Sequence, residues 1–145
     1  MRMTKGEYRS FSESRQPHSP VGKHAAAAFL VGGLICCLGQ LLLELFGRAG
    51  LDKQGASTAA AIVLVLLGAA LTGLGVYDDV AKFAGAGTLV PITGFANSIA
   101  APALEFKTEG FITGTAAKMF VIAGPVLVYG IAASVVYGLL LVLFG

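Results

Sequence analysis

The sequence predicts an all-α integral membrane protein with about four membrane segments, of which the third is broken or re-entrant at Pro91–Gly94. Composition supports this in two ways: hydrophobic residues make up 56% of the chain, and charged residues make up 12%, about half the share of a soluble domain. The third observation is the pattern, because long uncharged runs alternate with short charged stretches. A chain of 145 residues has room for one domain at most.

Residues 1–24 form a polar segment that cannot build a core, so we expect a mobile tail or a short surface helix. Five of the ten basic residues of the chain lie in this tail: Arg2, Lys5, Arg9, Arg15 and Lys23. The loop after the first apolar run holds only Arg48 and Lys53. Because basic residues favour the inner side of the membrane, this asymmetry predicts a cytoplasmic N-terminus.

Residues 25–145 form the predicted membrane domain, with spans at about 25–46, 55–77, 83–104 and 119–144. Each run is long enough to cross a bilayer, which takes about 20 apolar residues. Small residues in the first two spans favour close packing of helices. Residues 103–118 mix charged and aromatic residues and predict an interfacial loop or helix, and Pro125 predicts a kink in the last span.

The run from residue 83 to 104 departs from an ordinary span because it contains two prolines and several glycines. Proline removes a backbone donor and clashes with the preceding turn, so an unbroken helix is not expected. We expect a first half-helix over residues 83–90, a break at Pro91–Gly94, and a second half-helix from Phe95 with Thr93 as its cap. The alternative is a kinked ordinary span whose polar groups satisfy each other.

A broken backbone at membrane depth is tolerated only inside protein or beside a water-filled cavity, and such segments commonly handle transported solutes. A half-helix N-terminus adds free N–H groups that favour anions. The predicted solute-contact residues are therefore Gly85, Gly87, Thr88, Pro91, Thr93, Gly94, Asn97 and Ser98. Charged residues predicted at the mouths of the path are Glu44, Asp78, Asp79, Lys82, Glu105 and Glu109; for Glu44 an interfacial carboxylate is the favoured explanation.

Nothing in the sequence indicates a reaction. It contains no nucleophile elbow, zinc-protease motif, phosphate-binding loop or dinucleotide fingerprint, and we expect no enzyme, no cofactor and no metal site. Asp78 and Asp79 are adjacent, and neighbouring residues of a helix point about 100° apart, so the two carboxylates converge poorly. Cys36 and Cys37 are interpreted as small packing residues, and a net charge of +2 is too low to indicate nucleic acid.

Two stretches, FLVGGLICCLGQLLLE and GLGVYDDVAKFAGAGTLVPITGFANSIAAPALEFKTEG, resemble the SpoVA membrane proteins of spore-forming bacteria. The resemblance covers roughly residues 20 to 145. It implies a place in the inner membrane of the forespore and spore. It further implies movement of dipicolinic acid, as its calcium chelate, inward during sporulation and outward at germination, through a channel opened by membrane tension. Implied partners are other SpoVA subunits, membrane-bound and soluble.

Three functions stay open at this point. The chain is expected to be a channel subunit lined by the broken segment, a non-conducting subunit that assembles or gates the channel, or an ion-coupled transporter that uses Asp78 or Asp79. A protomer with about four short membrane segments is too small to enclose a wide path, so we expect a homo- or hetero-oligomer in the lipid bilayer.

Overall fold

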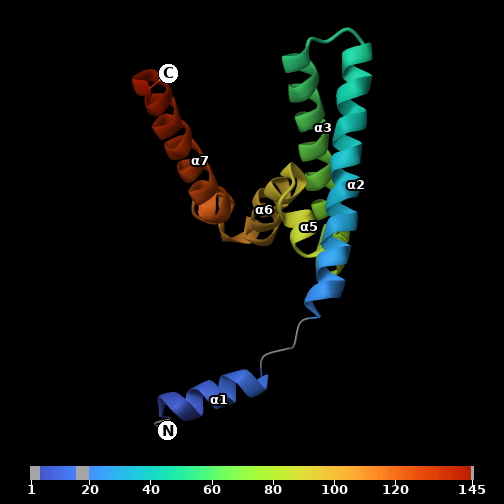
Figure 1. Cartoon of the computed structure of the whole chain (residues 1–145). Helices are drawn as coiled ribbons and strands as arrows, with labels where there is room; N and C mark the ends of the chain where they lie inside the picture. Colours follow the sequence, from blue (N-terminus) through green and yellow to red (C-terminus); the bar gives the residue numbers. More distant parts are fainter. Residues whose placement is uncertain (1–3, 16–19, 145) are drawn as a thin grey trace.

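The computed structural model describes residues 4–15 and 20–144, and all regular structure in these residues is helical, which confirms the all-α prediction (Figure 1). The helices are α1 Lys5–Arg15, α2 Val21–Arg48, α3 Lys53–Gly73, α4 Val76–Ala84, α5 Ala86–Leu89, α6 Ile92–Glu105 and α7 Ala117–Phe144. A 3₁₀ turn at Lys107–Glu109 and a π-helix at Phe111–Ala116 connect α6 to α7.

Three of the described helices are long and apolar enough to cross a membrane: α2 with 28 residues, α3 with 21, and the 34 residues of the π-helix and α7 together. By contrast α6 has 14 residues, or about 21 Å of helix, and is too short to cross. The predicted second span was wrong at its end: α3 stops at Gly73, because Gly75 takes a left-handed conformation with φ of 74° and starts α4.

The broken segment turns back within the membrane region. Two pairs of neighbours set its direction: the Thr93 carbonyl lies against Gly68, and Asn97 is hydrogen-bonded to Thr72. The step from Thr93 to Asn97 along α6 thus follows the same direction as the step from Gly68 to Thr72 along α3. The two helices therefore run parallel and end on the same side. Gly68 lies five residues before the end of α3, and α6 starts one residue before Thr93, so α6 begins about 9 Å from that end. Helices α4 to α6 therefore form a re-entrant unit.

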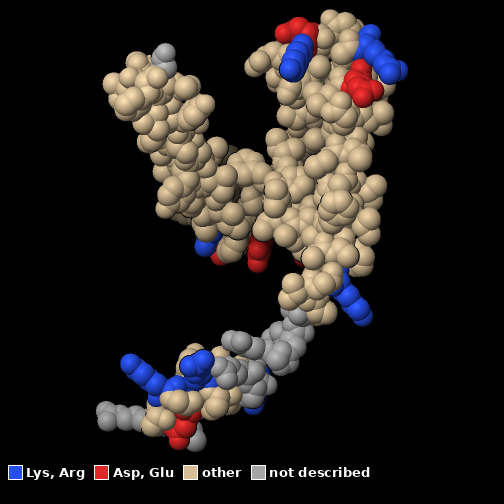
Figure 2. All heavy atoms as spheres, viewed as in Figure 1, with Lys and Arg blue, Asp and Glu red and all other residues tan. Residues whose placement is uncertain are grey.

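The distribution of charge agrees with this arrangement. Figure 2 shows charged atoms at two levels of the helical body, one at the turn between α2 and α3 and one at the opposite end, with none between them on the visible face. The sequence accounts for these levels, because residues 24–43, 54–77, 83–104 and 119–145 carry no charge. The C-terminal end of α7 lies on the side of the α2–α3 turn, opposite to the start of α2.

The re-entrant unit has two breaks, and the second lies at the start of the break predicted at Pro91–Gly94, whereas the first was not predicted. The first is at Gly85, whose φ of 52° separates α4 from α5; the second is at Val90 and Pro91. Phe83 therefore lies in the last turn of α4, which ends at Ala84, instead of opening a half-helix. Helix α6 begins at Ile92 with Pro91 in the N-cap position, where its missing N–H costs nothing. The prediction that Thr93 caps the second half-helix was wrong.

The tightest packing lies where α2, α3 and the re-entrant unit meet. Its buried residues include the small Ala84 and Ala96, whereas Ala56 and Ala60 are buried between α2 and the first turns of α3. Helix α7 makes its main contacts with α6 and the π-helix and leaves the bundle as a separate arm (Figure 1). Residues 106–116 form the corner between α6 and α7, where Lys118 stacks on the Phe106 ring at 4.4 Å. This corner lies at one of the two charged ends of the helical body (Figure 2), in agreement with the predicted interfacial connection.

Candidate solute-contact site

The first polar cluster of the re-entrant unit is closed. It consists of Tyr77, Thr88 and Thr93, which are 4%, 1% and 7% exposed. The Tyr77 hydroxyl donates to the Thr88 carbonyl at 2.8 Å and lies 3.1 Å from Thr93 Oγ1. The Thr88 hydroxyl donates to the carbonyl of Gly85 at 3.0 Å. Every hydroxyl of this closed cluster has a protein partner, so it stabilises the bend of the backbone and offers nothing to a solute.

The glycines predicted to contact solute are mostly sites of close backbone approach. A Cβ on Gly94 would overlap the carbonyls of Thr88 and Leu89, and a Cβ on Gly87 would overlap the backbone of Ala28 in α2. At Gly85 there is space, but its positive φ requires glycine. Pro91 borders an apolar groove of about 330 Å³ between α2 and α5, which carries no charged side chain.

The second polar cluster is open. A cavity of about 460 Å³ lies between the ends of α3 and α6 and is lined by Thr72, Asp78, Asn97, Ala101, Leu104 and Glu105. The Thr72 hydroxyl lies 2.8 Å from Asn97 Oδ1 and 2.7 Å from the Gly68 carbonyl. The single Thr72 proton is shared between these two acceptors, and the contact holds the Asn97 side chain at the cavity. Among the described residues no acceptor binds the Asn97 amide NH₂, so its two donors are available to a ligand.

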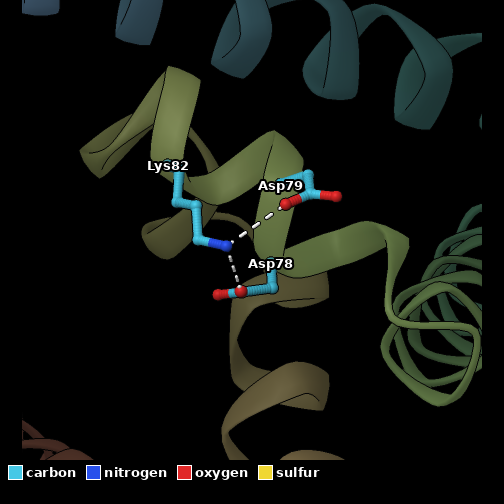
Figure 3. Close-up of polar contacts among 3 residues, drawn as sticks. All are labelled: Asp78, Asp79 and Lys82. Atoms are coloured by element: carbon cyan, nitrogen blue, oxygen red, sulfur yellow. Dashed lines mark hydrogen bonds and ion pairs between the residues drawn. The ribbon is translucent and has the colours of Figure 1, made fainter.

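Three predicted residues, Asp78, Asn97 and Glu105, are thus brought together at one cavity; with Thr72 they are called the open cluster below. Asp78 belongs to an exposed ion-pair group on α4 (Figure 3). Lys82 Nζ lies 2.7 Å from Asp78 Oδ2 and 3.2 Å from Asp79 Oδ1. The hydrogen bonds that Lys82 donates to Asp78 and to Asp79, together with both negative charges, raise the pKa of Lys82, which stays cationic.

The charges around the cavity sum to an excess of carboxylate. Of the residues that line it, Asp78 and Glu105 give a formal charge of −2 at the mouth, which the ion pair between Asp78 and Lys82 offsets in part. Within the described part of the chain Glu105 has no ion pair. An isolated dianion is repelled here, whereas a cation or a solute that presents a bound cation is attracted.

The other predicted residues lie elsewhere. Glu44 forms a 3.7 Å ion pair with Arg48 near the α2–α3 turn, at the far end of the molecule. Ser98 donates to the Phe95 carbonyl of its own helix at 2.7 Å, and neither Ser98 nor Glu109 lines the cavity. Sequence reasoning missed Thr72, which lies inside the predicted second span. Thr72 is recognised as part of the site only because the packing of α3 on α6 places it opposite Asn97.

Comparisons with known proteins agree with the resemblance seen in the sequence. The family described as SpoVAC/SpoVAEB sporulation membrane protein matches residues 24–140. The chain is 44% identical over 137 residues to stage V sporulation protein AC of Bacillus subtilis (strain 168), covering 94% of this chain and 91% of that protein. No solved structure matches the chain. The protein therefore belongs to the SpoVAC/SpoVAEB family of sporulation membrane proteins.

Proposed function

We propose that this protein is a channel subunit that moves dipicolinic acid, as its calcium chelate, into the forespore during sporulation and out of the spore at germination. Membership of a sporulation membrane family supports the setting. The observation that carries the proposal is the open cluster, which places an amide, a hydroxyl and two carboxylates around one cavity at the end of an otherwise uncharged membrane region. Polar groups in such a place typically mark the route of a solute.

The charge of the cavity mouth favours the chelate over the free acid. Dipicolinate carries two negative charges and is repelled by the formal charge of −2 at the mouth. Its one-to-one complex with calcium is neutral and keeps coordination positions on the metal, which prefers carboxylate and carbonyl oxygens. Asp78 and Glu105 meet the calcium, and the Asn97 NH₂ donates to a carboxylate of the solute. Such contacts bind weakly enough for the solute to leave.

One protomer does not enclose a path, because the cavity is open and α7 stands apart from the bundle. The channel is therefore completed by further copies or by other SpoVA subunits, including a soluble one. Membrane tension is the proposed opening signal. With the N-terminus on the cytoplasmic side, the open cluster faces the cytoplasm of the spore in its inner membrane, and the C-terminus of α7 lies on the opposite side.

Spores that carry Asn97→Leu test this proposal. The leucine keeps the size of the side chain but removes the amide donors from the cavity. Ser98→Leu is the matched control, because Ser98 lies next along α6 and bonds only its own helix. We expect Asn97→Leu spores to hold less than about a tenth of the normal dipicolinate, with the protein still in the membrane, and Ser98→Leu spores to stay near normal. Normal dipicolinate content in spores of both variants would show that the open cluster does not line the path of the solute.

A non-conducting role in assembly is the second candidate, and the glycines of the re-entrant unit favour it. Gly87 and Gly94 serve close packing, and the groove between α2 and α5 is apolar. In that case a neighbouring subunit carries the solute, and purified protein in vesicles passes no solute under tension. An ion-coupled transporter, the third function considered, would instead depend on a proton or sodium gradient.

A further inference from the structure

The N-terminal helix α1 lies outside the family match and outside the proposed path, and it carries a surface of its own. Its start is fixed by a reciprocal capping box between Thr4 and Glu7. The Thr4 N–H donates to Glu7 Oε2 at 2.8 Å, and the Glu7 N–H donates to Thr4 Oγ1 at 3.4 Å. The bonds that the Glu7 carboxylate accepts from the Thr4 N–H and then from the Thr4 hydroxyl lower the pKa of Glu7, so its carboxylate stays charged at the helix N-terminus, where the helix dipole favours it.

One side of α1 is aromatic and cationic. Tyr8 and Phe11 are three residues apart and therefore lie on the same face, with 65% and 48% of their surfaces exposed. Arg15 continues this face, and its guanidinium lies 4.9 Å from the centre of the Phe11 ring. The opposite side holds Gly6, where an added Cβ would meet no atom within 4 Å. Helix α1 packs extensively on no other described helix (Figure 1).

The charge and the tether of α1 indicate what this face meets. Residues 1–24 hold five basic side chains against two acidic ones, a net charge of +3 with neutral histidines. Five residues separate the end of α1 from the start of α2, so the C-terminal end of α1 stays within about 20 Å of the point where α2 begins, close to the membrane surface. Aromatic rings with basic residues around them are typical of helices that lie in the headgroup region of anionic bilayers.

We propose that α1 lies on the membrane surface and binds anionic lipid headgroups, with Tyr8 and Phe11 turned toward the acyl chains and Arg9 and Arg15 over the phosphates. The bilayer is favoured over an acidic protein because the tether holds the helix at the surface at all times. This inference does not depend on solute transport, so it stands or falls separately from the proposed channel.

The chain contains no tryptophan, so one introduced tryptophan reports on α1 in the full-length protein. Phe11→Trp is placed in vesicles of phosphatidylglycerol with brominated acyl chains, and Gly6→Trp is the matched control on the other face. We expect blue-shifted emission from Phe11→Trp and quenching at least about twofold stronger than for Gly6→Trp. Equal quenching of the two variants, or emission typical of water from both, overturns the proposal.

The charge requirement is tested with the same reporter. In phosphatidylcholine vesicles, or after Arg9→Gln and Arg15→Gln in phosphatidylglycerol, the quenching of Phe11→Trp is expected to fall about twofold or more. High salt is expected to act in the same direction. Quenching that is unchanged by lipid charge, by both substitutions and by salt overturns the anionic-lipid assignment. The assignment is also overturned if the tryptophan becomes buried only after a soluble partner protein is added.

Discussion

The re-entrant unit contains two polar clusters that look alike in the sequence and differ in the structure. In the closed cluster, Tyr77, Thr88 and Thr93 are buried and satisfy one another. In the open cluster, Thr72 holds Asn97 at the edge of a cavity of about 460 Å³ that also contains Asp78 and Glu105. Thr93 and Asn97 are only one helical turn apart on α6. The difference teaches that a polar residue in a broken membrane segment binds solute only where its partners leave donors free.

The largest expected effect concerns the glycines of the re-entrant unit, which the comparison treats as sites of close packing. Gly94→Leu is expected to cost more than about 3 kcal/mol, because its side chain would overlap the Thr88 and Leu89 carbonyls. The measurement is the amount of folded protein in the membrane and its unfolding in detergent. Gly130→Leu on α7, where an added Cβ meets no atom within 4 Å, is the control and should change little. Full recovery of folded Gly94→Leu protein would show that this contact is not tight.

Removing one hydroxyl from the closed cluster sharpens the contrast. Tyr77→Phe leaves the Thr88 carbonyl and the Thr93 hydroxyl without their partner, at an expected cost of about 1–3 kcal/mol. The unfolding midpoint in detergent measures this loss. Tyr129→Phe, at a side chain that is 76% exposed on α7, should leave the midpoint unchanged. A Tyr77→Phe protein as stable as the parent would mean that the buried hydroxyl is not structural.

The open cluster should show the reverse pattern, with a small effect on stability and a large one on transport. Asn97→Leu loses one hydrogen bond, but Thr72 keeps its bond to the Gly68 carbonyl, so the cost is expected to be below about 1 kcal/mol. Unfolding in detergent is compared with the dipicolinate content of spores. A loss of stability as large as that of Tyr77→Phe would erase the distinction between the two clusters.

The smallest expected effect concerns the charge at the mouth. Glu105→Gln removes one negative charge from the cavity and is expected to lower the flux of the calcium chelate about threefold at low salt, with little change in folding. The effect should shrink as salt rises, because screening weakens the attraction. Glu109→Gln, outside the cavity, provides the control. Flux that rises after Glu105→Gln would indicate that the free dianion is the transported form.

Much of the fold was predictable because the bilayer imposes it. Uncharged runs gave α2, α3 and α7 to within a few residues at their starts, and the prolines and glycines identified the segment that does not cross. Whether that segment crosses or returns was left open by the sequence, since it depends on α6 lying parallel to α3. The left-handed turn at Gly75, which ends α3 early, was not predictable either. In the sequence, a glycine at such a turn looks the same as a glycine inside a span.

The candidate site was predictable in its residue types but not in its membership. Asn97, Asp78 and Glu105 were identified as polar or charged groups near the break, and the structure brings them to one cavity. Thr88 and Thr93 carried the same signal and are buried. A hydroxyl that faces a tyrosine and one that faces a cavity cannot be told apart without the contacts between helices, and Thr72 was missed for the same reason.

The proposed function can be tested directly with purified protein in vesicles loaded with calcium dipicolinate, whose release is followed while osmotic downshift stretches the membrane. The account predicts release from vesicles that contain the parent protein or Ser98→Leu, and almost none from vesicles that contain Asn97→Leu. Equal release from vesicles with Asn97→Leu and with the parent protein would contradict a path through the open cluster. So would an absence of release from the parent alone, if adding other subunits restored the same release with the parent chain and with Asn97→Leu.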